Sequence, residues 1–567
     1  MANFPSSPGV SLNELDQTFI SGTPIKVGAA IIGPTVKGPV EVPILVTSYS
    51  DYKNRFGGAF ISGSDTYSYL TSLAAYNYFV EGGESLLVAR VTSGSYSVAT
   101  SSIISNGYDI TSSSFSLETL SEGEIMNNNG TLSLDGALSS GTADNIRWEI
   151  SAANSGSGTF NVLIRRGDDK TSDRIVLESF NGVNLDPTSP RFISKIIGDQ
   201  VVAYDSELNQ VNIFTGSYNN ASRYVRVKDV SPTPYYLDNS GNAVPAYTSS
   251  IPINGTGSFS GAEGTIKGGA NFNDNIDSSN TQGLIGGNYT NMIKLLSNSN
   301  DYQFNILTTP GLTNADQNSE VTSIITNTIQ RGDSIYVVDM VGYQATLADV
   351  VSNTQQRNTS YAATYWPWLQ VQDPETGKNI WVPASTLIPG VYAYTDKVSN
   401  SWNAPAGISR GGLSTVLRAK QKLSEANKSE LYDNNVNPIN TFPRKGIVVF
   451  GQKTLQKAAS ALDRIGVRRS LLELKSYIGQ VADTLVFEQN TAATRNKFLA
   501  EINPYLEVIQ QKGGLYAFKV VMDDRNNTSD VIDRNQLIGQ IYIQPTRTAE
   551  FISLDFVLLP TGAEFPA

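Results

Sequence analysis

Two short stretches, FNILTTPG at residues 304–311 and SIYVVDMVG at residues 334–342, decide the fold class of this chain. Each is a short apolar run containing β-branched residues, which is the pattern of a strand buried on both faces. Helical patterns follow over residues 319–331 and 345–356, and a further strand pattern lies around residues 361–371. Strands that alternate with helices at this spacing predict a largely parallel sheet covered by helices on both faces.

The same alternation occurs near the N-terminus. VGAAIIG and VEVPILVTS are strand-like runs, AAYNYFVEGG at residues 74–83 suits a helix, and SLLVARV at residues 85–91 is again a strand. The two α/β parts are separated by a long stretch of different character. We therefore predict a discontinuous α/β core domain formed by residues 26–92 and 296–405.

Residues 93–295 are β-rich by pattern. Short alternating runs such as NVLIRR and RIVLESF are separated by turns of Ser, Gly and Asn, and no helical period extends over any length. This segment is expected to form one or two inserted β-rich outer domains.

The last part of the chain combines helices with strands. A long helix is predicted to begin near Val467, because its apolar residues step by four and three positions. A second helix is expected over residues 491–511, closed by Gly513 and Gly514. The apolar seam of the first helix consists of Val467, Leu471, Leu474, Ile478, Val481 and Leu485.

Strand patterns follow these helices and reach the C-terminus. With the strand run GIVVFG at residues 446–451, they predict an α+β C-terminal domain over residues 406–548. Extended arms are expected at both ends of the chain, over residues 1–25 and 549–567. The apolar anchors of the arms are Val10, Leu12 and Leu15 at the N-terminus and the alternating Ile552, Leu554, Phe556 and Leu558 at the C-terminus.

Composition limits the chemistry that this chain of 567 residues can perform. It contains neither Cys nor His, which excludes disulfides, thiolate nucleophiles and Ser-His-Asp catalysis within one chain. The nucleophile-elbow pattern GISRG around Ser409 therefore has no His partner. Two Asp/Asn-rich runs, at residues 271–277 and 523–530, lack the Gly and Glu of an EF-hand. We expect no enzyme activity, no metal and no cofactor.

Charge is unevenly distributed along the chain. The net charge is −11, yet residues 408–567 carry 20 Lys and Arg against 16 Asp and Glu. Such asymmetry is more typical of contact with an acidic protein surface, another copy of the chain included, than of nucleic-acid binding. A basic cluster stands out, which is either a solvated face or a docking face: Arg444, Lys445, Lys453, Lys457, Arg464, Arg468, Arg469 and Lys475.

Membrane insertion and secretion are not indicated. The N-terminus MANFPSSPGVSLNE has neither the basic nor the apolar region of a signal peptide, and no apolar run approaches the roughly 18–20 residues that span a bilayer. We expect a soluble chain made in a cytoplasm, without direct contact with a membrane.

The loop YTDKVSNSWNAPAG at residues 394–407 presents Trp402 in a polar, Gly- and Pro-containing context. An exposed Trp on a loop is unfavourable unless something covers it. We expect Trp402 to fill the seam between the core and C-terminal domains, with Pro405 stiffening the exit. A neighbouring subunit is the second possible cover.

A series of motifs in one order resembles the contractile phage tail sheath family. The C-terminal motifs are IGVRRSLLELKSYIGQ, LVFEQN, NKFLAEINPYLE, KGGLYAFKVVMDDRNNTSDVID and IGQIYIQPTRTAEFISLDF. WVPASTLIPGVYAYTDKVSNSWNAPAG precedes them, and PGVSLNE, GPTVKGP and AAYNYFVEGGESLLVARV are similar to the opening of the family. The resemblance covers about residues 1–92 and 300–567, and leaves the middle of the chain unmatched.

The resemblance implies a structural virion protein. Sheath proteins assemble into six-fold rings stacked helically around a tail tube, bind baseplate and tail terminator proteins, and contract to drive the tube through the host envelope during genome delivery. It also implies that the two arms exchange strands with neighbouring subunits, which agrees with the expectation that an unpaired edge strand binds another chain's strand. Assembly is expected in the host cytoplasm.

Two further expectations concern the C-terminal domain and the hinges. The helix at residues 467–486 and its basic neighbours Arg468, Arg469 and Lys475 are expected to face the tube, which makes this domain tube-proximal. Residues 22–24 and the linker near Pro545 are expected to act as hinges.

Two alternative functions remain from the sequence. The sheath of a phage-derived contractile injection or secretion system would share the fold. A secreted carbohydrate-binding or carboxylate glycosidase β protein would explain the polar middle of the chain, but not its non-secretory N-terminus or its α/β ends.

Overall fold

An eight-stranded sheet forms the centre of the molecule in the computed structural model, which describes residues 28–107, 111–266 and 276–551. Six adjacent strands pair in parallel, and one antiparallel strand closes each edge. The mixed α/β class predicted from the sequence is confirmed. The strand order is β2 (Ile44–Val46), β5 (Leu86–Arg90), β1 (Ala29–Gly33), β16 (Ile306–Thr313), β17 (Ile335–Asp339), β18 (Ala362–Trp366), β22 (Asn437–Phe442) and β23 (Gly446–Val449).

The central strands are buried on both faces, which explains their continuous apolar runs. Along β1, Ala29 and Ile31 enter one hydrophobic cluster, while Ala30 and Ile32 enter the other. Helices α1 (Tyr49–Phe56), α2 (Leu70–Val80) and α8 (Ile388–Val398) contribute to the first cluster. The second is covered by α5 (Thr290–Leu295), α6 (Asn318–Arg331), α7 (Leu347–Thr354) and α9 (Glu425–Asp433).

The second part of the core domain extends beyond its predicted range of residues 296–405 at both ends. Strands β22 and β23 belong to the central sheet, so the core continues past residue 405 to at least Val449. The short helix η2 (Gly286–Tyr289) and α5 pack into the second cluster, so the core resumes before residue 296. A short apolar strand has the same pattern in any sheet, and the sequence therefore does not reveal which sheet it joins.

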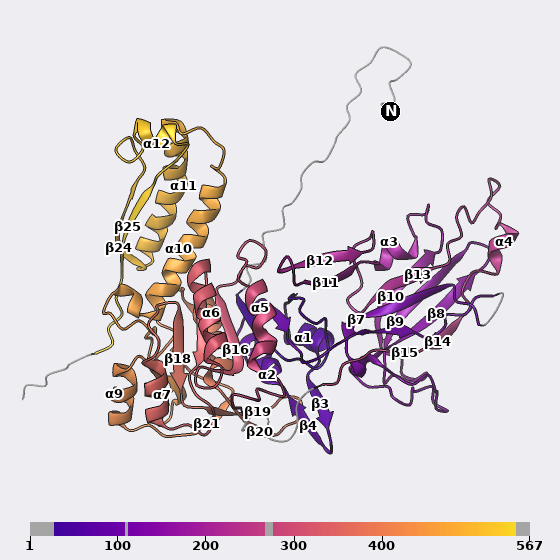
Figure 1. Cartoon of the computed structure of the whole chain (residues 1–567), viewed down its shortest axis with the longest axis horizontal. Coiled ribbons are helices and arrows are strands. Elements are labelled where there is room, and N and C mark those ends of the chain that lie inside the picture. The colour runs from indigo at the N-terminus through magenta and orange to yellow at the C-terminus, as the bar shows by residue number, and fades with distance from the viewer. Residues whose placement is uncertain (1–27, 108–110, 267–275, 552–567) are drawn as a thin grey trace, which may run out of the picture.

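The insertion consists of antiparallel sheets around a separate core (Figure 1). One four-stranded sheet has the order β10 (Val176–Asn184), β9 (Thr159–Arg166), β8 (Ile146–Asn154) and β14 (Gly255–Gly257). The other has the order β13 (Val225–Val230), β7 (Phe115–Glu122), β6 (Val98–Ser101) and β15 (Phe259–Ser260). The hairpin of β11 (Val201–Asp205) and β12 (Gln210–Thr215) returns toward the core domain, where Tyr204 and Val211 pack.

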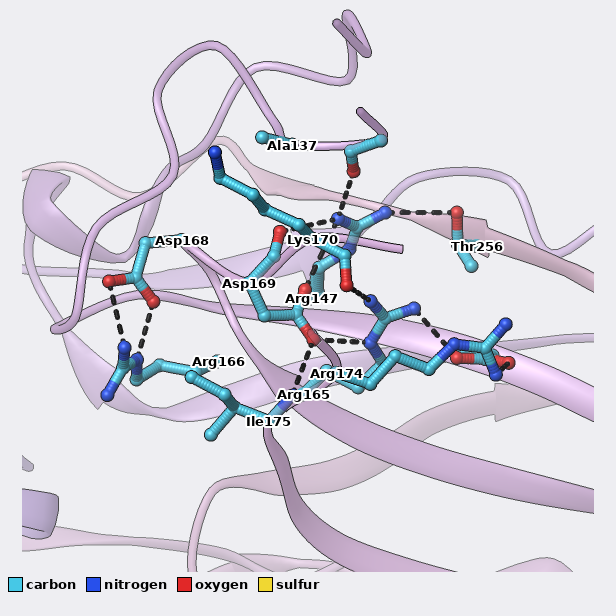
Figure 2. A network of polar contacts seen from close by, with 12 residues as sticks. Ala137, Arg147, Arg165, Arg166, Asp168, Asp169, Lys170, Arg174, Ile175 and Thr256 are labelled. Atoms are coloured by element: carbon cyan, nitrogen blue, oxygen red, sulfur yellow. Dashed lines mark hydrogen bonds and ion pairs between the residues drawn. The ribbon is translucent and has the colours of Figure 1, made fainter. Parts of the chain in front are cut away.

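A buried charge network closes one face of the β8–β9 pair (Figure 2). Strand alternation sends Trp148 into the apolar core and Arg147 to the opposite face. There Asp169 Oδ2 accepts from Arg165 Nε at 2.6 Å, and Glu149 Oε2 accepts from Arg165 Nη1 at 2.7 Å. Removing one partner of a buried ion pair leaves an uncompensated charge, which typically costs about 3–5 kcal/mol. The network therefore fixes the loop between β9 and β10, which carries Asp169, to the sheet.

The C-terminal domain packs two long helices against a hairpin. Its elements are α10 (Ile465–Asp483), α11 (Ala492–Gln511), β24 (Leu515–Val521), α12 (Ser529–Asp533) and β25 (Gln540–Pro545). Both predicted helices are present within two residues of their expected starts. Leu474, Val481 and Leu485 of the predicted seam join the core of this domain. Among the described residues, no helix is both long and apolar enough to cross a membrane.

Asp339, the last residue of β17, is a buried carboxyl group in the core domain. Its Oδ1 accepts from the Ser385 backbone N–H at 3.2 Å, and its other oxygen accepts from the Ser385 hydroxyl. Burial raises the pKa of Asp339 to about 7, and the hydrogen bonds from Ser385 only partly oppose this. The unfolded state therefore releases this proton first as the pH rises, so folded-state stability falls between about pH 4 and pH 7.

We expect Asp339→Asn to remove this loss of stability. The difference in unfolding free energy between variant and wild type should grow in favour of the variant from pH 4.5 to pH 7.5, by at most roughly 4 kcal/mol. Urea denaturation followed by tryptophan fluorescence at several pH values measures it. Asp349→Asn is the matched control, because the Thr346 backbone and hydroxyl lower the pKa of Asp349 and reverse the sign. A pH-independent difference for Asp339→Asn would contradict the assignment.

Candidate assembly surfaces

The first turns of α10 join the C-terminal domain to the central sheet. Arg468 Nη2 donates to the Ser360 hydroxyl, and its guanidinium lies 4.0 Å from the centroid of the Tyr361 ring. Arg469 Nη2 lies 2.5 Å from Asp396 Oδ2, and its guanidinium stacks 4.6 Å from the Tyr392 ring centroid. Both arginines are therefore part of a built contact between two domains.

This burial corrects the expectation that Arg468 and Arg469 face a tube. Their exposed fractions are 3% and 5%, so neither guanidinium is available to a partner of the folded chain. Lys475 alone of the three is exposed. Arg side chains are mostly solvated in helices, and the sequence does not show that aromatic rings on two other elements cover these two.

Trp402 lies beyond the end of α8 and is half-buried against the C-terminal core. A Cβ added to Gly514 would lie 2.9 Å from Trp402 Cδ2, so the indole leaves no room for a side chain there. A Cβ on Gly466 of α10 would lie 2.8 Å from the Trp402 carbonyl oxygen. The structure thus places Trp402 against its own chain, and Pro405 is buried beside it.

The root of the C-terminal arm is held by Glu550. Arg464 Nε and Nη2 donate to its two carboxylate oxygens at 2.7 and 2.9 Å. Gln452 Nε2 donates at 2.9 Å, and the Tyr432 hydroxyl donates as well. Burial alone would raise the pKa of Glu550, but these hydrogen bonds outweigh it and hold the pKa below its usual value. We call these four side chains the arm clasp.

The sequence gives no signal for the arm clasp. Its members are separated by up to 118 positions, and each is unremarkable in its local pattern. They come from α9, from the segment after β23 and from the start of α10, and their hydrogen bonds to Glu550 bring these three segments together. Figure 1 shows α9 and the start of α10 near the point where the described chain ends.

The β24–β25 hairpin has open strand edges in the described part of the chain, because no third strand pairs with it. The outer edge of β23 is closed by residues 407–413, which form backbone hydrogen bonds with Ile447 and Val449. Unpaired edges expose backbone donors and acceptors that another strand can satisfy. The residues predicted to exchange strands, namely Val10, Leu12, Leu15, Ile552, Leu554, Phe556 and Leu558, all lie outside the described residues.

No metal-binding cluster of three or more His, Cys, Asp or Glu side chains occurs among the described residues. The open edges of the β24–β25 hairpin can accept a strand from another chain.

Two family models match adjacent parts of the chain. The phage tail sheath protein central domain matches residues 282–455, and the phage tail sheath C-terminal domain matches residues 457–558. Their boundary follows β23, as the sheet topology requires, and not residue 405.

Sequence relatives agree with these matches, and one solved structure shares the fold. The chain is 40% identical over 224 residues to the tail sheath protein of Vibrio phage KVP40, and 36% identical over 229 residues to that of Enterobacteria phage T4. These matches cover 40% of this chain but only 33% and 35% of the relatives, about a third of their length. The crystal structure of a sheath tail protein from Listeria innocua aligns with a TM-score of 0.50 and 12% identity, over 92% of this chain and 95% of that one.

We predict that Trp402→Ala weakens the docking of the C-terminal domain. Removing the indole opens a cavity beside Gly514, with an expected loss of roughly 2 kcal/mol for a half-buried Trp. Hydrogen exchange should accelerate in α10 and β24 and remain unchanged in β1 and β17. Trp402→Phe should retain most of the protection. Equal acceleration in the central sheet would contradict a local role.

We also predict that Glu550→Gln loosens the arm root. The neutral amide no longer neutralises Arg464, and trypsin should cleave after Arg547 several-fold faster in the folded protein. Timed proteolysis with mass spectrometry measures the rate. Glu425→Gln, which removes an exposed ion pair with Lys428 on α9, should leave cleavage at Arg547 unchanged. Equal cleavage rates in wild type and Glu550→Gln would rule out a clasp.

Proposed function

Residues 282–558 belong to the phage tail sheath family, and from this premise we propose that the chain is a subunit of a contractile tail sheath. Copies would form six-fold rings stacked helically around a tail tube, and would contract to drive the tube through the host envelope during genome delivery. The observation that carries the proposal is the match of two consecutive sheath domains in family order. The relatives are phage tail sheath proteins, which favours a tail over an injection or secretion system.

Strand exchange is the proposed link between copies. The hairpin β24–β25 is two-stranded in the described chain, and added strands would satisfy its open edges. The N-terminal arm and the alternating C-terminal residues are the proposed donors. Main-chain hydrogen bonds of this kind connect subunits while their bodies rotate, provided that the arm roots can bend.

The proposed contraction is a change between two packings of rigid bodies. The buried network of the insertion and the cation–π contacts of Arg468 and Arg469 support bodies that move without internal rearrangement. Bending would then concentrate at the arm roots, at residues 22–24 and after Pro545, where β25 ends. No catalytic step is required, since energy would be stored in the extended lattice.

Partners follow from this proposal. They are other copies of the chain, the tail tube protein, and the baseplate and tail terminator proteins, with assembly in the host cytoplasm and final location in the virion. Lys475 is the proposed tube-facing cation on α10, because Arg468 and Arg469 are buried.

We expect deletion of residues 1–20 or of residues 549–567 to abolish polymerisation separately. Each deletion removes one proposed donor strand and leaves the described core nearly intact, so circular dichroism and the melting temperature should change little. Electron microscopy of the purified chain should show hollow six-fold tubes for wild type and monomers for both deletions. Monodisperse wild-type monomers under all assembly conditions, including added tube protein, would overturn the proposed function.

A further inference from the structure

The far end of the C-terminal domain presents apolar side chains to solvent. Phe487 is fully exposed, at 103%, and Val486 is 58% exposed. Ile532 of α12 and Ile538 are also exposed. We call these four residues the tip patch; α12 marks their end of the domain, opposite the central sheet (Figure 1).

Hydrogen bonds join the two loops that carry the tip patch. Phe487 has φ of 72°, a left-handed conformation that is disfavoured for a bulky residue and persists only when its surroundings impose it. The preceding Leu485 is buried in the domain core. Asn490 Nδ2 donates to the Gln536 carbonyl at 2.8 Å, and Asn527 exchanges two hydrogen bonds of 2.9 Å with the Ile538 backbone. These bonds tie the two loops of the patch together.

Acidic residues surround the tip patch. The arginines near it are paired, as Arg495–Asp524, Arg525–Asp523 and Arg534–Asp530. Asp483, Glu488 and Asp533 have no ion-pair partner among the described residues. An apolar centre with a polar rim is the usual anatomy of a protein interface, and here the rim is negative.

A hollow of about 390 Å³ lies at the opposite end of the same domain. Its apolar lining includes Ala459, Ala461 and Val467, and Arg464 and Arg547 contribute cations. Arg464 pairs with both acids of the lining, Asp463 and Glu550. Arg547 has no ion-pair partner in the described chain, and Lys457, two residues before Ala459, bonds only to a carbonyl. The unpaired charge at this mouth is therefore positive.

We propose that the tip patch of one copy inserts into this hollow of the next copy. Benzene fits an apolar cavity of roughly 150 Å³, so a hollow of about 390 Å³ has room for the Phe487 ring with Val486. The acidic rim would meet the unpaired cations. The inference rests on the proposed function, because it names a contact between polymerising copies.

The two surfaces cannot meet within one chain. Helix α10 separates them, and its 19 residues rise roughly 28 Å. A contact between different surfaces of identical subunits is heterologous, and it generates rings or helical filaments rather than closed dimers. This geometry suits repeated addition of copies.

The absence of Cys from the chain makes a direct test possible. In Gln489→Cys/Ala461→Cys, which places a thiol at an exposed position beside the tip patch and leaves Phe487 and Val486 in place, oxidation of assembled protein should yield a ladder of covalent oligomers on a non-reducing gel. Each single variant should yield no ladder beyond a dimer. Ile61→Cys/Ala461→Cys is the matched control, because Ile61 is also exposed but lies on the hairpin of β3 (Ala59–Ser62) and β4 (Asp65–Ser68). This control should yield no ladder.

The outcomes separate this inference from the proposed function. Tubes without a ladder in Gln489→Cys/Ala461→Cys would overturn the tip contact while the sheath function stands. An equal ladder in the Ile61 control would show random collision and would also overturn it. A wild type that forms no tubes would instead overturn the proposed function. As a second measurement, Phe487→Ser should raise the protein concentration needed for polymerisation at least tenfold, and an unchanged threshold would contradict the contact.

Discussion

Helix α10 must satisfy two hydrophobic cores at once, and the arrangement of the C-terminal half depends on this constraint. Ile465 and Leu472 enter the cluster of the central sheet, whereas Leu474 and Val481 enter the core of the C-terminal domain. A helix committed on two faces cannot rotate about its axis without exposing one set. The orientation of the C-terminal domain is thereby fixed relative to the sheet.

The buried Arg468 and Arg469 also fix the position of α10 along its axis. Two apolar faces alone would tolerate sliding, since hydrophobic burial has little directional preference. Arg468 and Arg469 add stacked rings and hydrogen-bond partners on β18-adjacent residues and on α8, so each has one favourable position. The same turn of helix begins at Arg464, which holds Glu550. The position of the arm root therefore follows from the docking of α10.

The sequence predicts those parts of the structure that depend on local periodicity. The central strands are apolar because both faces are covered, and the apolar spacing of α10 brings Leu474 and Val481 into the C-terminal core. Features that depend on distant partners could not be predicted in the same way. The sequence context of Arg468 is that of a solvent-exposed helical residue, and only the fold shows that Tyr361 covers it. The apolar pattern of β23 does not reveal which sheet the strand joins. Glu550 contacts residues up to 118 positions away in the sequence. The exposure of Phe487 does have a local sequence signal, because Phe487 lies outside the predicted apolar seam, which ends at Leu485.

A lattice that contracts needs rigid bodies and compliant connections in the same chain, and the distribution of buried charge separates the two. Within the bodies, ion pairs such as Arg165–Asp169 are almost completely buried, so breaking them would leave a charge in a medium of low polarity. At the arm root, the Arg464–Glu550 pair is partly solvated, with side-chain exposures of 26% and 20%. Water can replace part of such a pair, so its opening is far less costly than opening the network of the insertion. A load applied through the arms would therefore bend the arm root before it deforms the insertion or the α10 joint.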